Sequence, residues 1–546
     1  MSKSAIVLKF KQNWKSGLTV SLVALPLSLS LGVAAGATPL MGVITAIWAG
    51  LVAAIFGGSN YNVVGPTGAL SGILATYALI HGVSSLPFLA ILSGIIILLF
   101  YALRWERYIV FIPASVVHGF TLGVASIIGL NQLNFALGLK GLVVHERFFD
   151  NVIESFAHIG QTSMVAFVLF VIALVALIAL KKYAPRIPGI IAVSIAGIGL
   201  GYAVQRGLVS LQIQTIASKF GAIPNRIASM PQFSFGAFGR ETVIAALTIA
   251  VVAILETLIS AKIADGMTKT KADQRKEMFG LGLANIASGI FGGIPATAAL
   301  ARTSLNIRSG ANNKMSAGVA AVGVIAIALV LLTGFQFLPL AFVAAILVSV
   351  ALAMVEREQF VHLYHYDKKV FALSMVVAGI TIVEDPIMGI LVGSVISLLM
   401  FVNTLSWAQG EITVNKNGSL VGRYRSDELE ALEDHGDVLV YRFAGQLTYI
   451  NAQGHLQALS RINEETKAVV LSFRNLFYID IDGVDAVAEM IEQLEQDGKM
   501  VYLSSVNHLI GALIKRSKWY TSLRDAGRIF DSASHAVKQL HSGGSR

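Results

Sequence analysis

The sequence contains no cysteine, so it supports neither a disulfide framework nor a thiolate metal site. Charged residues are also scarce: they make up 13% of the 546 residues, whereas hydrophobic residues make up 55%. A chain with so few charges lies outside the usual composition of soluble globular proteins. The scarcity of charge, together with the high hydrophobic content, predicts a membrane protein that crosses the bilayer several times.

The sequence has instead a series of apolar runs of roughly 15 to 22 residues, the length that a helix needs to span a bilayer. The first run follows Met1–Lys15, which is rich in lysine, but it has no small-residue cleavage site. We therefore interpret it as a transmembrane helix rather than a signal peptide. The fourteen predicted spans lie at residues 18–36, 40–56, 66–80, 86–103, 109–129, 161–180, 187–205, 241–263, 277–292, 295–308, 315–333, 337–355, 370–383 and 385–405.

The net charge of +9 reflects membrane topology rather than nucleic-acid binding. If the N-terminus is cytoplasmic, most Lys and Arg residues between the spans fall in inside segments such as 262–276, and few fall in outside segments such as 206–240. The positive-inside rule then places both ends of the membrane part in the cytoplasm. The expected location is the inner membrane of a bacterium, and we expect no nucleic-acid partner.

The composition changes at about Gly410, where charges become frequent and the apolar residues fall into short blocks. The segments "DVLVYRFAG", "AVVLSFRN" and "MVYLSS" are typical of strands, and "GVDAVAEMIEQLEQDGK", which ends near Gly498, and "VNHLIGALIKRSK" are typical of helices. Alternating strands and helices predict a small cytoplasmic α/β domain. The predicted domains are therefore residues 1–408, in the membrane, and residues 409–546.

Two similar segments containing glycine and proline interrupt the apolar runs. The stretch "IFGGSNYNVVGPTGAL" at Ile55–Leu70 returns in shorter form as "IFGGIPATAAL" at Ile290–Leu300. These breaks precede the third and the tenth span, so the fourteen spans divide into seven plus seven. Because each half has an odd number of spans, the halves have opposite orientations, which predicts an inverted-topology repeat.

In transporters with inverted repeats, such breaks lead into short half-helices whose N-termini meet near the middle of the bilayer. We expect a strand to enter a helix at Gly65–Pro66, because proline is favoured in a first helical turn and valine in extended chain. The tenth span should begin between Pro295 and Leu300. Two facing helix N-termini with unpaired amides predict an anion site.

At these residues the chain resembles a known family. The segments "GPTGAL", "LETLISAKIADGMT" at Leu255–Thr268 and "GGIPATAALARTSLNIRSGA" at Gly292–Ala311, with the C-terminal domain, resemble the sulfate permease (SulP) family, relatives of the animal solute carrier family 26. The resemblance covers nearly the whole chain. It implies fourteen spans in core and gate domains, a C-terminal STAS domain, elevator-type movement, a homodimer, and transport of small anions such as sulfate, bicarbonate, chloride or dicarboxylates.

The resemblance also bears on the substrate. Many family members have Pro-Gln in the first span, whereas Pro26 is followed here by Leu27 and Ser28, which looks more like the cyanobacterial bicarbonate-transporting branch. We predict transport of a sulfate-type oxyanion, with Na⁺-coupled bicarbonate symport as the alternative. The expected substrate-binding residues are Ser28, Gly65, Pro66, Thr67, Gly68, Thr297, Ala298, Ala301 and Arg302.

Glu256 is the acid that stands out, because it lies deep in the eighth span, where an unpaired carboxylate costs ~2.5 kcal/mol or more. It matches the position of the coupling carboxylate of the family, and Ser260 shares its helix face at i+4. The alternative is a structural acid bonded to a neighbouring helix. The bicarbonate branch has Asp here, and a longer acid in a dry site can carry a proton. We predict proton coupling, with Na⁺ at Glu256 and Ser260 as the alternative.

Arg302 is expected to add its positive charge to the anion site, since the family places a basic residue beside the substrate at this motif. The alternative is an arginine whose side chain extends to the cytoplasmic face. Thr67 and Thr297 lie near the two expected helix N-termini, where they either bind an oxyanion or cap the helices.

We predict no metal site and no cofactor. His118 in the fifth span has no second histidine or acid at helical spacing, so we expect a packed or pore-lining residue. In the C-terminal domain, Ile481 and Asp482 occupy the two positions that carry hydroxyl residues in STAS domains of the anti-sigma-antagonist type. Phosphorylation is therefore not expected at this turn, and we favour a structural helix cap over a regulatory contact.

Two other functional classes remain open at this stage. A nucleobase transporter of the same fold needs recognition of a neutral ring, which Arg302 beside two helix N-termini disfavours. A membrane-anchored sensor that signals through the C-terminal domain needs neither Glu256 nor the repeated breaks. An enzyme is not expected, because no set of nucleophile, base and orienting residue is evident.

Overall fold

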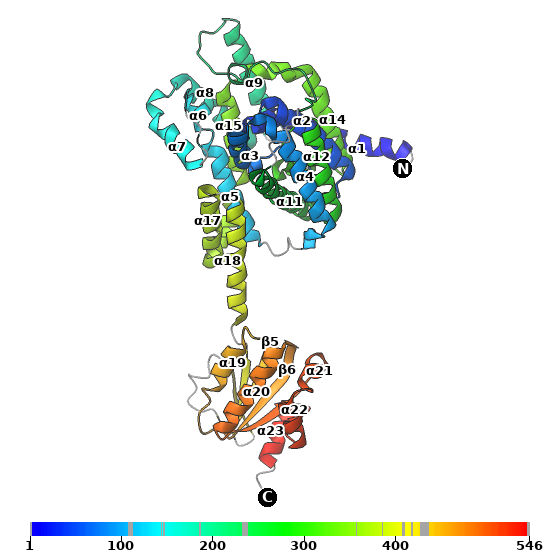
Figure 1. Ribbon diagram of the computed structural model, residues 1–546, viewed down its shortest axis with the longest axis vertical. Helices are drawn as coiled ribbons and strands as arrows, with labels where there is room; N and C mark the ends of the chain where they lie inside the picture. The colour runs from blue at the N-terminus through cyan, green and yellow to red at the C-terminus, as the bar shows by residue number, and fades with distance from the viewer. Residues whose placement is uncertain are drawn as a thin grey trace. The chain divides into compact units, whose positions relative to one another are not determined.

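The computed structural model describes residues 3–107, 113–142, 145, 148–184, 187–231, 239–355, 357–384, 386–406, 410–416, 419–425 and 436–542. The chain divides into two compact units, Met1–Ser397 and Leu398–Arg546. The first unit is built of helices and the second combines a sheet with helices (Figure 1). The predicted domain boundary between residues 408 and 409 lies outside the described residues and stays a prediction.

Each predicted span corresponds to a helix within the described ranges. Nine helical segments of those ranges are long and apolar enough to cross a membrane. The helices that correspond to the spans are α1 (Lys3–Ala34), α2 (Pro39–Phe56), α3 (Gly68–His81), α4 (Leu86–Ala102), α5 (Ala114–Leu130), α8 (Met164–Tyr183), α9 (Gly189–Gln205), α11 (Arg240–Thr268), α12 (Gln274–Ile290), α13 (Leu300–Arg308), α14 (Met315–Leu331), α15 (Leu340–Met354), α17 (Lys368–Val383) and α18 (Pro386–Ser406).

Shorter helices join these spans. They are η1 (Val83–Ser85), α6 (Leu133–Leu137), α7 (Phe148–Ala157), η3 (Ile159–Gln161), α10 (Ile216–Phe220), η5 (Leu332–Phe337) and α16 (Arg357–Tyr366). The helices α3 and α13 have 14 and 9 residues, whereas a helix needs about 20 to cross the hydrocarbon layer. They are the half-helices that the two sequence breaks predict.

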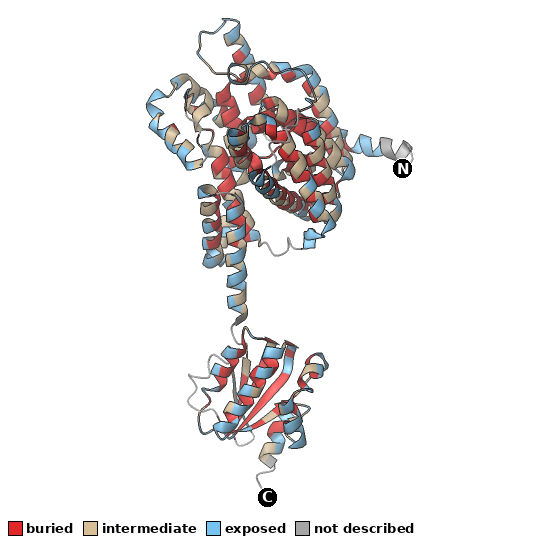
Figure 2. Ribbon diagram, viewed as in Figure 1, coloured by how far each residue is buried: buried red, intermediate tan, exposed pale blue. Residues whose placement is uncertain are grey.

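The helices of the first unit pack in two groups. One group contains α1, α2, α4, α11, α12 and α14, and the other contains α5, α8, α15 and α17. This grouping agrees with the core and gate that the family resemblance implies. Buried residues concentrate where helices face one another, while α8 exposes Phe167, Ile172 and Val175 (Figure 2). Such an exposed apolar face is typical of a helix in contact with lipid.

The second unit is built on a six-stranded sheet of order β4-β3-β5-β6-β7-β8. The strand β3 pairs antiparallel with β4 and β5, and the strands from β5 to β8 are parallel. The strands are β3 (Gly410–Lys416), β4 (Ser419–Arg425), β5 (Val438–Leu447), β6 (Ala468–Ile479), β7 (Met500–Ser504) and β8 (Ile529–Phe530), and the helices are α19 (Ala452–Leu459), α20 (Ile481–Gln496), α21 (His508–Ile514), α22 (Lys518–Asp525) and α23 (Ala533–Ser542).

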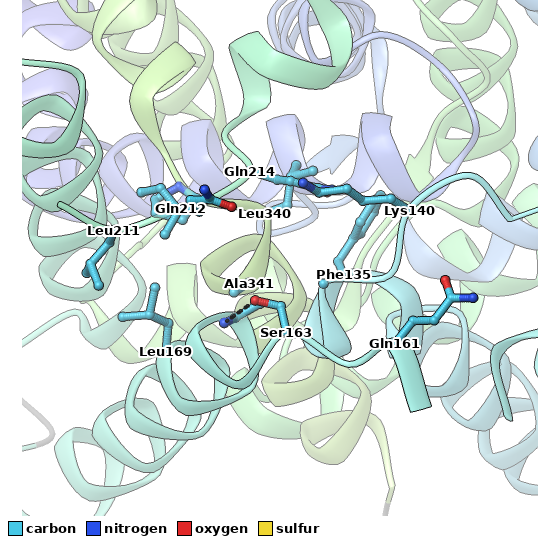
Figure 3. Close-up of a pocket in the computed structure, with 14 residues that line it drawn as sticks. Phe135, Lys140, Gln161, Ser163, Leu169, Leu211, Gln212, Gln214, Leu340 and Ala341 are labelled. Carbon is cyan, nitrogen blue, oxygen red and sulfur yellow. Dashed lines mark hydrogen bonds between the residues drawn. The ribbon is translucent and has the colours of Figure 1, made fainter. Parts of the chain in front are cut away.

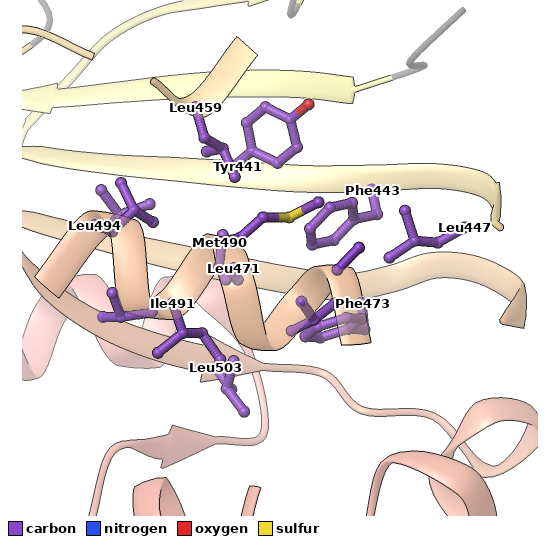
Figure 4. Packing of buried hydrophobic residues seen from close by; sticks show 14 of the residues in the cluster. Tyr441, Phe443, Leu447, Leu459, Leu471, Phe473, Met490, Ile491, Leu494 and Leu503 are labelled. Atoms are coloured by element: carbon purple, nitrogen blue, oxygen red, sulfur yellow. The ribbon is translucent and has the colours of Figure 1, made fainter. Parts of the chain in front are cut away.

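Helices cover both faces of this sheet, which gives the second unit its own core. Alternate residues of β5 point to opposite faces, as the period of two in a strand requires. Tyr441 and Phe443 pack with Met490 of α20 on one face (Figure 4), and Val440 packs with Ala536 of α23 on the other. The predicted α/β domain is therefore confirmed, and Gly498, at φ +75°, follows α20 as expected.

Candidate functional site

The two sequence breaks meet in a short antiparallel ribbon. The strand β1 (Val64–Gly65) pairs with β2 (Thr297–Ala298), and Val64 lies opposite Ala298 while Gly65 lies opposite Thr297. The half-helix α3 follows β1 and the half-helix α13 follows β2, so both present their first, unpaired amides near this ribbon. The predicted meeting of the two breaks is confirmed.

The repeated Phe-Gly-Gly motif has a packing explanation. Phe56, at the end of α2, packs edge to face on Phe279 of α12, and Phe291, just after α12, stacks on Trp48 of α2 at 3.6 Å between ring centroids. Each phenylalanine thus packs at the contact between α2 and α12, which occupy equivalent positions in the two halves. The glycines allow close backbone approach: a Cβ on Gly58 would lie 2.0 Å from the carbonyl oxygen of Asp273.

The second break is held by buried side chains of α2 and α12. Thr45 Oγ1 accepts a hydrogen bond from Ile294 N at 2.8 Å, and Ser288 Oγ donates to Ile294 O at 2.7 Å. Asn285 pairs with the backbone of Ala296 through both its oxygen and its nitrogen. These contacts satisfy backbone groups that would otherwise be buried without partners.

Arg302 lies at the ribbon and does not extend to the cytoplasmic face. Its side chain is 2% exposed, and its Nη2 donates to Pro66 O at 2.7 Å. Its Nε and Nη1 have no hydrogen-bond partner among the described residues. The guanidinium lies against the Cα of Gly65, where a Cβ would lie 2.5 Å from Nη1. Gly65 therefore makes room for the arginine, which joins the two breaks.

Glu256 of α11 contacts the first break through Thr67. Thr67 Oγ1 donates to Glu256 Oε2 at 3.1 Å, and the carboxylate also interacts with Thr297 and with the charge of Arg302. Thr67 occupies the N-cap of α3, yet its side chain makes no capping hydrogen bond. Of the two expected roles of Thr67, the side-chain cap is thus not observed, because its hydroxyl donates to the acid, and oxyanion binding stays a prediction.

The expected start of the half-helix at Gly65–Pro66 was wrong by two residues. Gly65 belongs to β1, and α3 begins at Gly68. Pro66 therefore lies between strand and helix, where its carbonyl is free to accept from Arg302. Gly68 needs to be small, because a Cβ there would lie 2.1 Å from Ile128 Cδ1 of α5.

The next turn of α11 and the strand β2 complete the polar cluster. Thr257 Oγ1 lies 3.0 Å from Thr297 Oγ1 and accepts from Ala298 N at 3.1 Å. Ser260 is 1% exposed, and its Oγ lies 3.1 Å from Thr303 Oγ1 of α13. The cluster thus links the acid-bearing helix to both breaks.

Two predicted site residues, Ser28 and Ala301, are not brought into this cluster by their contacts. Ser28 of α1 is fully buried and its Oγ has no partner among the described residues, but its backbone packs on Gly42 of α2. Ala301 is exposed, whereas the adjacent Arg302 is buried. His118 packs edge to face near Phe360, in line with the expected packed residue.

Besides Thr45 and Ser288, sequence reasoning missed four further polar residues that hold the breaks. They are Asn62, Glu277, Asn285 and Thr303, all buried. A buried acid in the first turn of a span was a usable signal at Glu277, because carboxylates are costly inside membranes. The other three are common polar residues in helices and loops, and nothing in their spacing distinguishes them. Across the residues that the structure describes, no group of three or more His, Cys, Asp or Glu side chains could hold a metal ion.

The space beside Arg302 is small in this conformation. A cavity of about 10 Å³, enough for a single water molecule, is lined by Arg302, Val64 and small residues of α1, α2 and α14. The space at the predicted anion site is therefore nearly closed, and apart from Arg302 its lining is mostly apolar. A larger cavity of about 550 Å³ lies elsewhere, between the starts of α8 and α15, and contains none of the predicted site residues (Figure 3).

Comparison with known proteins assigns the family. Residues 10–377 match the sulfate permease family, and residues 431–536 match the STAS domain. The chain is 29% identical over 500 residues to the "Putative sulfate transporter YvdB" of Bacillus subtilis, covering 90% of this chain and 91% of that protein. It is 25% identical over 505 residues to the "Bicarbonate transporter BicA" of Picosynechococcus, covering 89% and 87%.

Solved structures show the same fold. The inward-facing anion transporter murine solute carrier 26 family member A9 aligns with a TM-score of 0.81 at 15% identity, covering 100% of this chain and 95% of that chain. The transmembrane domain of the cyanobacterial bicarbonate transporter BicA aligns with a TM-score of 0.60 at 21% identity, covering 71% and 97%. With its helical membrane unit and C-terminal STAS domain, the chain belongs to the sulfate permease family, whose members are anion transporters and not enzymes.

Proposed function

We propose that this chain is a secondary active transporter that carries a small oxyanion of the sulfate type across a bacterial inner membrane. The observation that carries the proposal is Arg302, buried between two half-helix N-termini with two N–H-bearing nitrogens that have no partner among the described residues. A buried guanidinium is a strong donor to an oxyanion, and the amides at the starts of α3 and α13 add partial positive charge. Bicarbonate is the alternative substrate, followed by dicarboxylates.

The small space at the site supports an elevator-type movement as part of this proposal. The cavity beside Arg302 holds about one water molecule, and Gly68 at the start of α3 abuts Ile128 of α5. An anion therefore needs the helices that carry the two breaks to shift relative to α5 before it can enter. Such a shift between two packed groups of helices is the alternating-access movement expected for inverted repeats.

Glu256 is the proposed coupling residue. Its hydrogen bond with Thr67, which precedes α3, joins the acid to the half-helix that faces the anion. Binding of a proton, our first choice, or of Na⁺ to Glu256 then changes the charge next to Arg302 and the contact with α3. The proposal includes cytoplasmic termini and a homodimer.

Flux measurements in proteoliposomes test the proposal. Purified protein is supplied with radiolabelled sulfate, bicarbonate, succinate or uracil under an imposed inward H⁺ or Na⁺ gradient. We expect sulfate to accumulate under the proton gradient, with bicarbonate as the next best substrate. Uptake of uracil alone would favour the nucleobase class, and an absence of flux for every solute would favour a sensor.

A further inference from the structure

A second buried carboxylate lies near the first break. Glu277, in the first turn of α12, is 3% exposed. Its Oε2 accepts from the backbone amides of Gly58 and Ser59, both at 2.7 Å, and its Oε1 accepts from Asn62 Nδ2 at 2.7 Å. Both oxygens act as acceptors toward N–H donors, so the geometry fits an ionised carboxylate, which has no hydrogen of its own to place.

The orientation of the Asn62 amide is fixed by its partners. Its Nδ2 donates to Glu277 Oε1 and also to the carbonyl oxygen of Thr257, at 3.1 Å. A carboxylate and a backbone carbonyl can only accept, so the NH₂ end of Asn62 must face them. The Oδ1 end then faces Ser260, whose Oγ lies 3.0 Å away and must donate to it.

This donation determines what Ser260 offers to its other neighbours. A serine hydroxyl has one hydrogen and two lone pairs. Ser260 Oγ lies 3.0 Å from Asn62 Oδ1 and 3.1 Å from Thr303 Oγ1, and it faces both oxygens as a donor. Its single hydrogen is therefore directed to this side, and its lone pairs are left for its other neighbours. Ser260 lies one helical turn after Glu256, on the same face of α11.

We propose that Glu277 is a positioning residue that, through Asn62, keeps Ser260 a hydrogen-bond acceptor toward the cation held at Glu256. The inference rests on the proposed coupling role of Glu256. It applies to either cation, because a protonated carboxyl group and a sodium ion both need an oxygen lone pair. A serine turned the other way would point its hydrogen at the coupling site and oppose binding.

The variant Glu277→Gln tests the chain of hydrogen bonds that runs from Glu277 through Asn62 to Ser260. The glutamine oxygen can keep the two backbone amides, and its NH₂ group then faces the NH₂ group of Asn62, donor against donor. Turning the Asn62 amide relieves this contact and brings its NH₂ group to Ser260, at the cost of its hydrogen bond to Thr257 O. We expect the cation concentration for half-maximal uptake to rise about tenfold, the effect of losing one favourable polar contact. The Michaelis constant for the anion at saturating cation should change less than twofold.

The experiment measures radiolabelled sulfate and bicarbonate uptake in proteoliposomes of the full chain, as a function of Na⁺ and of pH. Ser260→Ala and the double variant complete a double-mutant cycle. We expect Glu277→Gln to add little in the Ser260→Ala background, because both act through the same oxygen. Asn62→Ala, which leaves the two backbone amides on Glu277, should raise the half-maximal cation concentration in the same way.

Ser288→Ala is the matched control, since Ser288 is a buried polar residue of the same helix that holds the second break. It should lower thermal stability without a selective change in cation dependence. This inference is wrong, while the proposed function stands, if wild-type uptake depends on the cation but the cation concentration for half-maximal uptake is the same in Glu277→Gln and Asn62→Ala as in the wild type. An equal effect of Glu277→Gln with and without Ser260 also contradicts it. Wild-type flux that ignores both gradients contradicts the coupling role of Glu256 itself.

Discussion

Thr67 and Glu256 are joined by a side-chain hydrogen bond although they are separated by 189 positions in the sequence. The bond connects the residue before a half-helix with the acid in the middle of a long helix of the other repeat. Any change in the charge of the acid is therefore felt at the start of α3, where we place the anion.

The first prediction concerns this acid. Glu256→Gln keeps the shape and the acceptor for Thr67 but removes the titratable charge. Gradient-driven accumulation should collapse, while anion binding or exchange partly survives. Uptake under imposed pH and Na⁺ gradients checks this. A Glu256→Gln protein that still concentrates its anion under either gradient rules out the coupling role, and wild-type uptake that follows Na⁺ and ignores pH replaces the proton with sodium.

The second prediction concerns anion affinity. Arg302→Ala removes a buried charged donor, whose contact with an oxyanion is worth ~1.5–3 kcal/mol, or roughly a tenfold to hundredfold loss of affinity. The matched control is Arg308→Ala, because Arg308 is an exposed arginine on the same helix. Sulfate binding to the purified protein measures both. Equal affinities in the two variants would place the substrate away from Arg302.

A third prediction uses the glycine that makes room for this arginine. In Gly65→Ala the new Cβ would lie 2.5 Å from Arg302 Nη1, so the flexible guanidinium has to move while the backbone keeps its place. The variant should fold but bind the anion more weakly, by about tenfold. Gly379→Ala in α17, where a Cβ meets nothing within 4 Å, should bind normally. Unchanged affinity in Gly65→Ala would show that the position of the guanidinium does not matter.

A fourth prediction concerns the STAS domain. It has its own core on both faces of the sheet, so residues from about 410 onward should fold when expressed alone. Deleting them should lower expression or transport rate without changing which anion is carried, as a comparison of substrate panels would show. A changed substrate profile would mean that specificity depends on this domain.

The STAS domain should also lose stability in acid. His455 is fully buried, its Nδ1 lies 2.7 Å from Tyr441 Oη, and burial lowers the pKa of His455 to about 4 from an ordinary value of 6.5. As pH falls from 6.5 to 4, His455 binds a proton in the unfolded chain but not in the folded domain. The free energy of unfolding therefore decreases over this window, by up to about 3 kcal/mol, and is unaffected by this group above it.

Denaturant unfolding of the isolated domain at several pH values checks this expectation. His455→Gln keeps an acceptor for Tyr441 and removes the titration, so its stability should depend less on pH between 6.5 and 4. His508→Gln, a change at an exposed histidine, should behave like the parent domain. A parent domain with constant stability across this window contradicts the assignment to His455.

The sequence predicted the membrane fold well because apolar runs report burial in lipid directly. The helix ends were less predictable. The helix α1 begins at Lys3, fifteen residues before the predicted span, because helix propensity continues through charged residues that hydropathy excludes. In the STAS domain the hairpin of β3 and β4 was missed, since β4 is polar and largely exposed and has no apolar face to mark it.

In the candidate site, too, some features were predictable from the sequence and others were not. The pairing of the two breaks was predictable from the repeated motif, the span count and the positive-inside rule. The contacts of Glu277 were not, because two of its three donors are backbone amides of Gly58 and Ser59, which leave no signature in side-chain identity. Which side of a short helix faces inward, as at Ala301 and Arg302, also depends on the register at which α13 begins.

The ribbon between the two breaks also dictates when the site can form. Pro66 and Arg302 are 236 positions apart, so a ribosome that adds roughly 5–20 residues per second needs about 10–50 s to supply the second partner after the first. During that interval the first half is in the bilayer with an unpaired strand, a costly state in hydrocarbon. Unpaired β1 must therefore be kept away from lipid until the second repeat has been inserted. Variants that weaken the ribbon should reduce the amount of newly made protein before they affect the mature protein.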